Sequence, residues 1–316
     1  MTQRLKNRVM AEFNAFSEVN VSPVPGSYFS KPETNLDPRI FLGDTLRPWV
    51  INSIKRILFD HLRIAYSSPE KWIKMWLAGS GVSYQWAAAR EPGDLDCLVG
   101  VIYPEFRHYN QEYAGLSDDE IAKMFNEDFY NTLLPKTKNW QGYELTYYVN
   151  PQTNILDINP YAAYDLISNS WTVKPEPRPA IPYSKAWDQR VQKDLDTAKE
   201  LIARYSQALS DVRSSATNPA YRVNAEKRLQ LAVDQAVAFY EDIHAGRKIA
   251  FSKIGSGYSD FNNYRWQAGK SSGVVHALKA IKDYKDLSDE EKQKDTYGIE
   301  LPDTETLIRR AAIHKS

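Results

Sequence analysis

Two aspartates separated by one residue, Asp94 and Asp96, open an apolar segment that continues to Ile102. Such a segment is typical of a central β-strand, in which alternate side chains point to the same face. We therefore expect both carboxylates to lie on one face of a sheet. Clustered carboxylates repel one another unless a cation lies among them, and oxygen ligands suit Mg²⁺ or Mn²⁺. The pair predicts a divalent-metal site.

A third carboxylate could complete this site. The pattern predicts a strand over residues 143–149, a turn over 150–154 and a second strand over 155–158, which together would form a hairpin. Asp157 lies in the second strand between Leu156 and Ile158, and an acid between apolar neighbours has few structural explanations. We therefore favour Asp157 as the third metal ligand. Glu144, at the start of the first strand, is the alternative.

A glycine–serine pair, Gly79 and Ser80, follows a predicted strand over residues 72–77 and precedes Asp94 by thirteen intervening residues. Backbone N–H groups and a hydroxyl at the start of a helix can hold phosphate oxygens. Ser80 is equally compatible with a helix N-cap. Together with a metal site, a phosphate cradle predicts phosphoryl or nucleotidyl transfer, in which metal ions stabilise the attacking and leaving oxygens.

The order Gly-Ser, Asp-x-Asp and lone Asp resembles the nucleotidyltransferase superfamily of DNA polymerase beta, CCA-adding enzymes and aminoglycoside nucleotidyltransferases. The resemblance covers about residues 70–165, and residues 155–161 resemble the third-carboxylate strand of the polymerase-beta branch. A looser similarity to uncharacterised nucleotidyltransferase-like proteins of bacteriophages extends to Arg247-Lys248 and to residues 264–267.

The resemblance implies an α+β fold, in which a polymerase-beta-like domain with a mixed sheet and helices precedes a helical C-terminal domain. It implies that Asp94 and Asp96 bind both metal ions, that Asp157 binds the catalytic one, and that Ser80 lies near the triphosphate. The expected reaction moves a nucleoside monophosphate from a nucleoside triphosphate, such as ATP, to an acceptor hydroxyl and releases pyrophosphate. A protein that retains this fold and binds a nucleotide or RNA without turnover is the alternative.

Four segments are expected along the chain. Residues 1–45 contain prolines with little periodicity and predict an N-terminal arm, and residues 46–173 hold the motifs above. Residues 174–183 contain four prolines and predict a linker. Residues 184–316 are expected to be helical, because apolar residues recur at helical spacing over 187–209, 229–243 and 274–281.

Basic and aromatic side chains alternate in the helical segment between Arg247 and Lys270. Such a mixture can stack a base and bind phosphates, so Arg265 and Lys270 are candidate nucleotide-binding residues. The alternative is a helix that packs Tyr264 and Trp266 into a core. The acceptor stays open: this segment slightly favours an RNA or tRNA 3′ end over a protein hydroxyl or a small molecule.

Composition excludes several other classes. The 316 residues carry 40 basic and 40 acidic side chains, a balance that argues against long duplex DNA as a partner. A single cysteine, Cys97, excludes an intramolecular disulfide, and we expect it in the core. No apolar run is long enough for a membrane span, and the start lacks a signal-peptide pattern. We expect a cytoplasmic protein, in the host cytoplasm if a phage encodes it.

Overall fold

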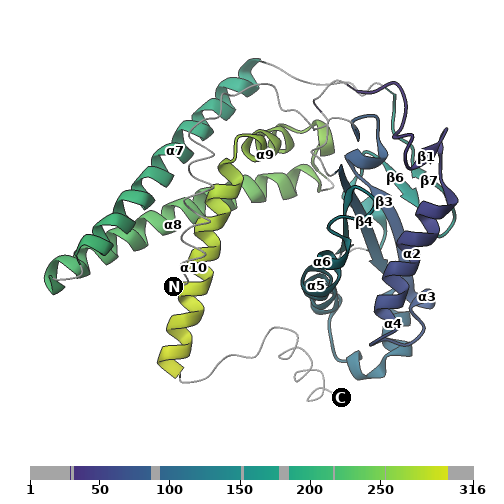
Figure 1. Ribbon diagram of the computed structural model, residues 1–316, viewed down its shortest axis with the longest axis horizontal. Coiled ribbons are helices and arrows are strands. Elements are labelled where there is room, and N and C mark those ends of the chain that lie inside the picture. Colours follow the sequence, from purple (N-terminus) through teal and green to yellow (C-terminus); the bar gives the residue numbers. More distant parts are fainter. Residues whose placement is uncertain are drawn as a thin grey trace. The chain divides into compact units, whose positions relative to one another are not determined.

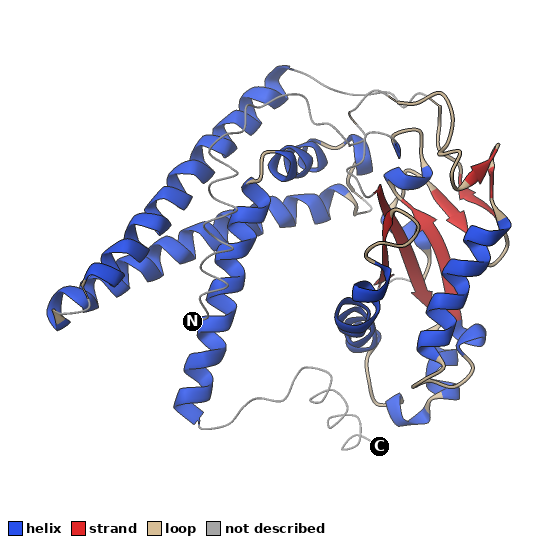
Figure 2. Ribbon diagram, viewed as in Figure 1, coloured by secondary structure: helices blue, strands red, loops and turns tan. Residues whose placement is uncertain are grey.

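The computed structural model describes residues 29, 32–86, 93–150, 153–177, 185–215, 218–252 and 254–297. These residues form two compact units, one built around a sheet and one of helices only (Figures 1 and 2). The main division along the chain falls between residues 180 and 181, inside the segment expected to be a linker. Of the expected arm, residues 32–45 belong to the sheet unit, and Leu36, Ile40 and Phe41 lie in its core. The rest of the arm, except Phe29, lies outside the described residues.

A five-stranded mixed sheet forms the first unit, as the α+β expectation requires. Its strands lie in the order β5 (Tyr143–Asn150), β4 (Gly93–Val101), β3 (Ile73–Ala78), β6 (Ala163–Asp165) and β7 (Ser170–Val173). Strands β4 and β5 are parallel, and every other neighbouring pair is antiparallel. A separate two-stranded ribbon joins β1 (Phe41–Leu42) to β2 (Thr45–Leu46).

Helices pack against one face of this sheet. They are α2 (Pro48–Leu62), α3 (Pro69–Trp72), α4 (Tyr103–Tyr109), α5 (Asp118–Asp128) and α6 (Leu134–Thr137), with short turns η3 (Gln111–Tyr113) and η4 (Phe129–Leu133). Pro48 occupies the first helical position of α2, where its missing N–H costs nothing. A capping box starts α5, since the Ser117 side chain accepts from the Glu120 N–H and the Glu120 side chain accepts from the Ser117 N–H.

The core face carries alternate residues of the two parallel strands. Leu95, Cys97 and Val99 of β4 are fully buried, as are Leu145 and Val149 of β5. Burial also raises the pKa of the Cys97 thiol, which fits the expected core role. The opposite face carries Asp94, Asp96 and Leu98, which are partly or fully exposed. We call this second surface the open face.

The expected hairpin is wrong. Strand β5 pairs in parallel with β4, and residues Ile155–Ile158 form a 3₁₀ turn, η5, instead of a strand. The Asn154 side chain accepts a hydrogen bond from the Leu156 N–H and so starts the turn. Ile155 and Ile158, three residues apart, then pack together against Trp76 and Ala78 on the open face, while Leu156 is 53% exposed.

Four long or medium helices form the second unit: α7 (Lys185–Ser214), α8 (Pro219–Ala250), α9 (Phe261–Ser271) and α10 (Val274–Tyr297), with a short turn η6 (Gly257–Ser259). The three predicted apolar patterns lie in α7, α8 and α10 and supply much of the buried surface, including Leu195, Ala236 and Leu278. Within the described parts of the chain, no helix is both long and apolar enough to cross a membrane.

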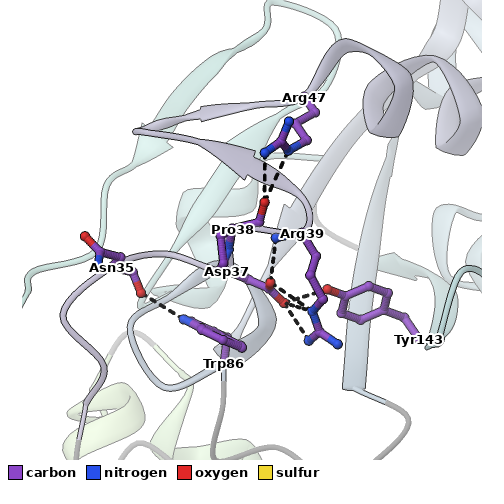
Figure 3. Close-up of polar contacts among 7 residues, drawn as sticks. All are labelled: Asn35, Asp37, Pro38, Arg39, Arg47, Trp86 and Tyr143. Atoms are coloured by element: carbon purple, nitrogen blue, oxygen red, sulfur yellow. Dashed lines mark hydrogen bonds and ion pairs between the residues drawn. The ribbon is translucent and has the colours of Figure 1, made fainter.

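A buried carboxylate anchors the segment before α2 to the first residue of β5 (Figure 3). Asp37 is 1% exposed and accepts hydrogen bonds from the Arg39 guanidinium, at 2.8 Å for Nη2 to Oδ2, and from the Tyr143 hydroxyl, at 2.5 Å. The guanidinium also lies 4.7 Å from the Tyr143 ring centroid. Burial alone would raise the pKa of Asp37, but these hydrogen bonds outweigh it and lower the pKa below its ordinary value of 3.8.

We expect Asp37→Asn to lower the free energy of unfolding of the sheet unit by about 1–2 kcal/mol at pH 7, because the buried side chain would lose the charge that accepts hydrogen bonds from Arg39 and Tyr143. Since the folded pKa is depressed, the stabilisation is complete above the unfolded pKa and is lost as pH falls through the folded value. Denaturant unfolding should therefore show a wild-type–variant difference that is constant from pH 7 to 5 and shrinks below about pH 4. Asp60→Asn, which removes an exposed partner of Arg63, is the control and should change stability by less than about 1 kcal/mol. An equal effect of the two substitutions would contradict this role for Asp37.

Candidate active site on the open face of the sheet

The two aspartates of the Asp-x-Asp motif lie on the open face of β4. Asp94 is half-buried and Asp96 is exposed, whereas Leu95 between them is buried in the core. The Thr146 hydroxyl of β5 donates a hydrogen bond of 2.9 Å to Oδ1 of Asp96 and so restrains that carboxylate. The pair therefore presents carboxylate oxygens from a rigid central strand.

Glu144 lies next to this pair. The parallel register sets Glu144 opposite Asp94 and Thr146 opposite Asp96, and residues opposite each other share a face of the sheet. Three carboxylates thus occupy neighbouring positions on two hydrogen-bonded strands. Glu144, the alternative third ligand in the sequence analysis, is therefore the acid next to the pair on the neighbouring strand.

Asp157, the favoured third ligand, lies on the 3₁₀ turn η5 and is half-buried. The turn rests on the open face through Ile155 and Ile158, which contact a cluster that includes Ala78, the cross-strand partner of Asp96. Asp157 is therefore on the same side of the sheet as the pair, but not on a strand beside it.

The described part of the chain contains no group of three Asp, Glu, His or Cys side chains close enough together to hold a metal ion. Neither Asp157 nor Glu144 therefore completes the expected three-carboxylate site with Asp94 and Asp96. Mg²⁺ is, however, commonly held by one or two carboxylates together with substrate phosphates and water. Asp94 and Asp96 fit that open kind of site.

The glycine–serine turn lies close to the motif. Gly79 has a φ of 85°, which favours glycine, and its N–H donates to the Ala162 carbonyl at 3.2 Å. A Cβ atom on Gly81 would lie 2.4 Å from the Asp94 carbonyl oxygen, so the turn packs directly against the start of β4. The sequence thus correctly associates the turn with Asp94.

The turn differs from the expectation in one respect. Ser80 begins a single 3₁₀ turn, η1 (Ser80–Val82), instead of a long helix, and makes no capping hydrogen bond through its side chain. The Ser80 carbonyl accepts hydrogen bonds from the N–H and hydroxyl of Ser83. A cradle here would rely on individual N–H groups of the turn and not on the dipole of a long helix.

The basic–aromatic segment has a structural explanation within the helical unit. Arg265 is 13% exposed, and its guanidinium is 2.7 Å from both Asp194 of α7 and Asp242 of α8. The Tyr264 hydroxyl donates to Asp188 at 2.6 Å, and Trp266 is buried beneath the guanidinium of Arg247. These contacts match the packing alternative, so the segment no longer favours an RNA acceptor.

Lys270 is different from Arg265. It lies in the last turn of α9 and is exposed. Its role in nucleotide binding stays a prediction.

An open pocket of about 960 Å³ adjoins Asp96 within the sheet unit. The pocket lies along the outer edge of β5, where the open-face side chains of Asp96, Thr146 and Tyr148 meet the core-face Tyr147 and the helical stretch from α5 to α6. Sequence reasoning missed it. The exposure of Tyr130 and Tyr148, each more than half exposed, marks this surface, and it is visible only in the structure.

Comparison with protein-family models, with characterised proteins and with solved structures finds no match for this chain. The geometry of the site is therefore the basis on which a function can be inferred.

We expect Arg265→Gln to destabilise the helical unit by about 1–3 kcal/mol, because Asp194 and Asp242 would lose their shared cation in a partly buried setting. Thermal unfolding followed by circular dichroism measures this loss. Arg204→Gln, which removes an exposed intrahelical pair with Glu200, is the matched control and should have little effect. If Arg265→Gln left stability unchanged and weakened nucleotide binding instead, the original interpretation as a phosphate ligand would be correct.

Proposed function

We propose that this protein is a metal-dependent nucleotidyltransferase that transfers a nucleoside monophosphate from a nucleoside triphosphate to an acceptor hydroxyl. One observation carries the proposal: the parallel register of β4 and β5 sets Glu144 beside Asp94 on the face that also carries Asp96. Carboxylates concentrated on a rigid strand pair, next to a glycine-containing turn, are suited to a magnesium–triphosphate complex.

In this proposal Asp94 and Asp96 hold Mg²⁺ or Mn²⁺ together with the triphosphate. The bound cation would offset phosphate charge and polarise the reacting phosphorus–oxygen bonds. The hydrogen bond from Thr146 fixes the orientation of the Asp96 carboxylate before substrate arrives. The N–H and hydroxyl of Ser80 would face the triphosphate oxygens, since the Gly79 N–H already donates to the Ala162 carbonyl.

The proposed reaction also needs a general base. The acceptor oxygen forms a bond to the α-phosphorus, the bond from that phosphorus to the β-phosphate oxygen breaks, and pyrophosphate leaves. The acceptor proton needs a base, and a carboxylate near the pair can receive it. Glu144 is the better placed by strand register, and Asp157 is the alternative on η5.

Substitution of the carboxylates tests this assignment. We expect Asp94→Asn and Asp96→Asn each to lower transfer by at least about a hundredfold, the scale seen when one group that stabilises transition-state charge is removed. Labelled nucleoside triphosphates, Mg²⁺ or Mn²⁺ and a panel of hydroxyl acceptors supply the assay, and pyrophosphate release is the readout. Glu144→Gln should cause a comparable loss, and Asp157→Asn a smaller one.

Glu112→Gln, an exposed acid on η3, is the matched control and should retain wild-type transfer. A double variant of Asp94 and Asp96 that transfers as well as wild type would refute the proposal. If the wild-type chain binds magnesium–nucleotide but releases no pyrophosphate with any acceptor, the non-catalytic alternative is correct. A larger loss with Asp157→Asn than with Glu144→Gln would reverse the choice of base.

A further inference from the structure

The pocket beside Asp96 has the size and position of a second substrate site. Its volume of about 960 Å³ lies within the range of small-molecule sites, about 300–1,000 Å³. Two cross-strand pairs, Asp96 with Thr146 and Leu98 with Tyr148, contribute to the lining from the open face. A ligand on this surface would have one end next to the Asp-x-Asp motif.

A π-helical turn builds the opposite wall. Residues Phe129–Leu133 (η4) form this uncommon turn directly before Pro135, whose ring would clash with the carbonyl of Asn131 in a regular α-helix. The Thr132 hydroxyl donates to the Asp128 carbonyl at 2.8 Å and to its carboxylate at 2.7 Å, which stabilises the wider turn. The turn places Tyr130 in the pocket lining with 68% of its surface exposed.

A residue of α2 also holds the start of the π-helical turn η4 in place. Nε2 of His61 lies 2.6 Å from Oδ2 of Asp128, the last residue of α5. Burial would raise the pKa of Asp128, but its hydrogen bonds with His61 and Thr132 lower it overall, so this carboxylate stays ionised. The pocket wall is therefore held in place before any ligand binds.

The charge of the pocket selects the kind of ligand. Its lining includes the carboxylates of Asp96, Asp119 and Glu127 against a single ammonium group, Lys123, which lies 3.9 Å from Glu127. Such a lining repels phosphate. Tyr130 and Tyr148, which is 51% exposed, add aromatic surface, and an organic cation gains from both carboxylates and aromatic faces.

We propose that this pocket binds the acceptor of the reaction, a small hydroxyl-bearing organic cation with an apolar or aromatic body. Its role as the acceptor site rests on the proposed function, whereas its preference for cations does not. The acceptor hydroxyl would approach from the Asp96 end, so its proton would leave toward the carboxylates of β4 and β5 while pyrophosphate departs.

Three benzyl compounds of different charge test the preference with the full-length chain, without nucleotide or metal. They are benzyltrimethylammonium, benzyl alcohol and benzylphosphonate, and saturation-transfer NMR titrations give their dissociation constants. We expect the cation to bind at least about tenfold more tightly than the phosphonate, since three carboxylates line the site. Tyr130→Ala and Tyr148→Ala should each weaken cation binding about two- to fivefold.

Charge variants and a tyrosine control complete the test. Asp119→Asn should weaken cation binding and Lys123→Gln should strengthen it, whereas Tyr221→Ala, which removes an exposed tyrosine of the helical unit, should have no effect. Equal or tighter binding of the phosphonate would overturn the inference and favour a nucleic-acid acceptor. Binding of none of the three compounds, or an equal loss in Tyr221→Ala, would also overturn it.

The result of these binding titrations can be distinguished from the result of the transferase assay. Cation binding that depends on Tyr130 and Tyr148, in a chain without transfer activity, would retain the pocket and refute the proposed function. Transfer activity in a chain that prefers the phosphonate would support the proposed function and refute the cation preference of the pocket.

Discussion

The parallel pairing of β4 with β5 is the constraint on which the rest of the sheet unit depends. Parallel neighbours need a long crossover, and residues 102–142 supply it as α4, α5, η4 and α6. Because successive side chains alternate between faces, a slip of one residue would turn Glu144 toward the core and Leu145 toward solvent. The burial of Leu145 and Val149 therefore fixes which acids share the open face with Asp94 and Asp96.

The ends of the two strands are tightly fixed at the site. A Cβ atom on Gly93 would lie 2.9 Å from the Tyr143 ring, so only glycine allows this close approach. Tyr143 in turn donates to the buried Asp37, which belongs to the segment before α2. Asp94 and Glu144, one residue further along each strand, thus follow a strand start that the buried Asp37 holds through its hydrogen bonds with Tyr143 and Arg39.

Local patterns in the sequence predict the elements that carry the motif. The alternation in residues 72–77 and 143–149, the apolar run from Asp94 and the Ser-x-x-Glu pattern at Ser117 each depend on neighbours within a few residues, and each corresponds to an observed element to within one or two residues. The segment 155–158 is too short for its pattern to distinguish a strand from a 3₁₀ turn. Apolar residues three apart fit a 3₁₀ turn, whereas the alternating acid between them suggests a strand.

Other features depend on partners that lie far along the chain. Arg265 has the appearance of a phosphate ligand in the sequence, but Asp194, 71 residues earlier, neutralises it in the structure. The pocket wall likewise needs the π turn, whose cause is a single proline, and a sheet surface formed by two separate strands. Neither arrangement has a short-range signature, so the sequence alone predicts the motif but not the surface beside it.

Asp96 belongs to both proposed sites, and this has a thermodynamic consequence. A divalent cation held by Asp96 would neutralise one of the three carboxylates that favour a cationic ligand in the pocket. Metal–nucleotide and cationic acceptor would then weaken each other's binding, and such coupling is reciprocal. Thr146 strengthens this antagonism, because its hydrogen bond to Oδ1 leaves Oδ2 of Asp96 as the oxygen that both partners would share. If both proposals hold, the shared carboxylate would bring the acceptor next to the reacting phosphate at the cost of some affinity for each substrate.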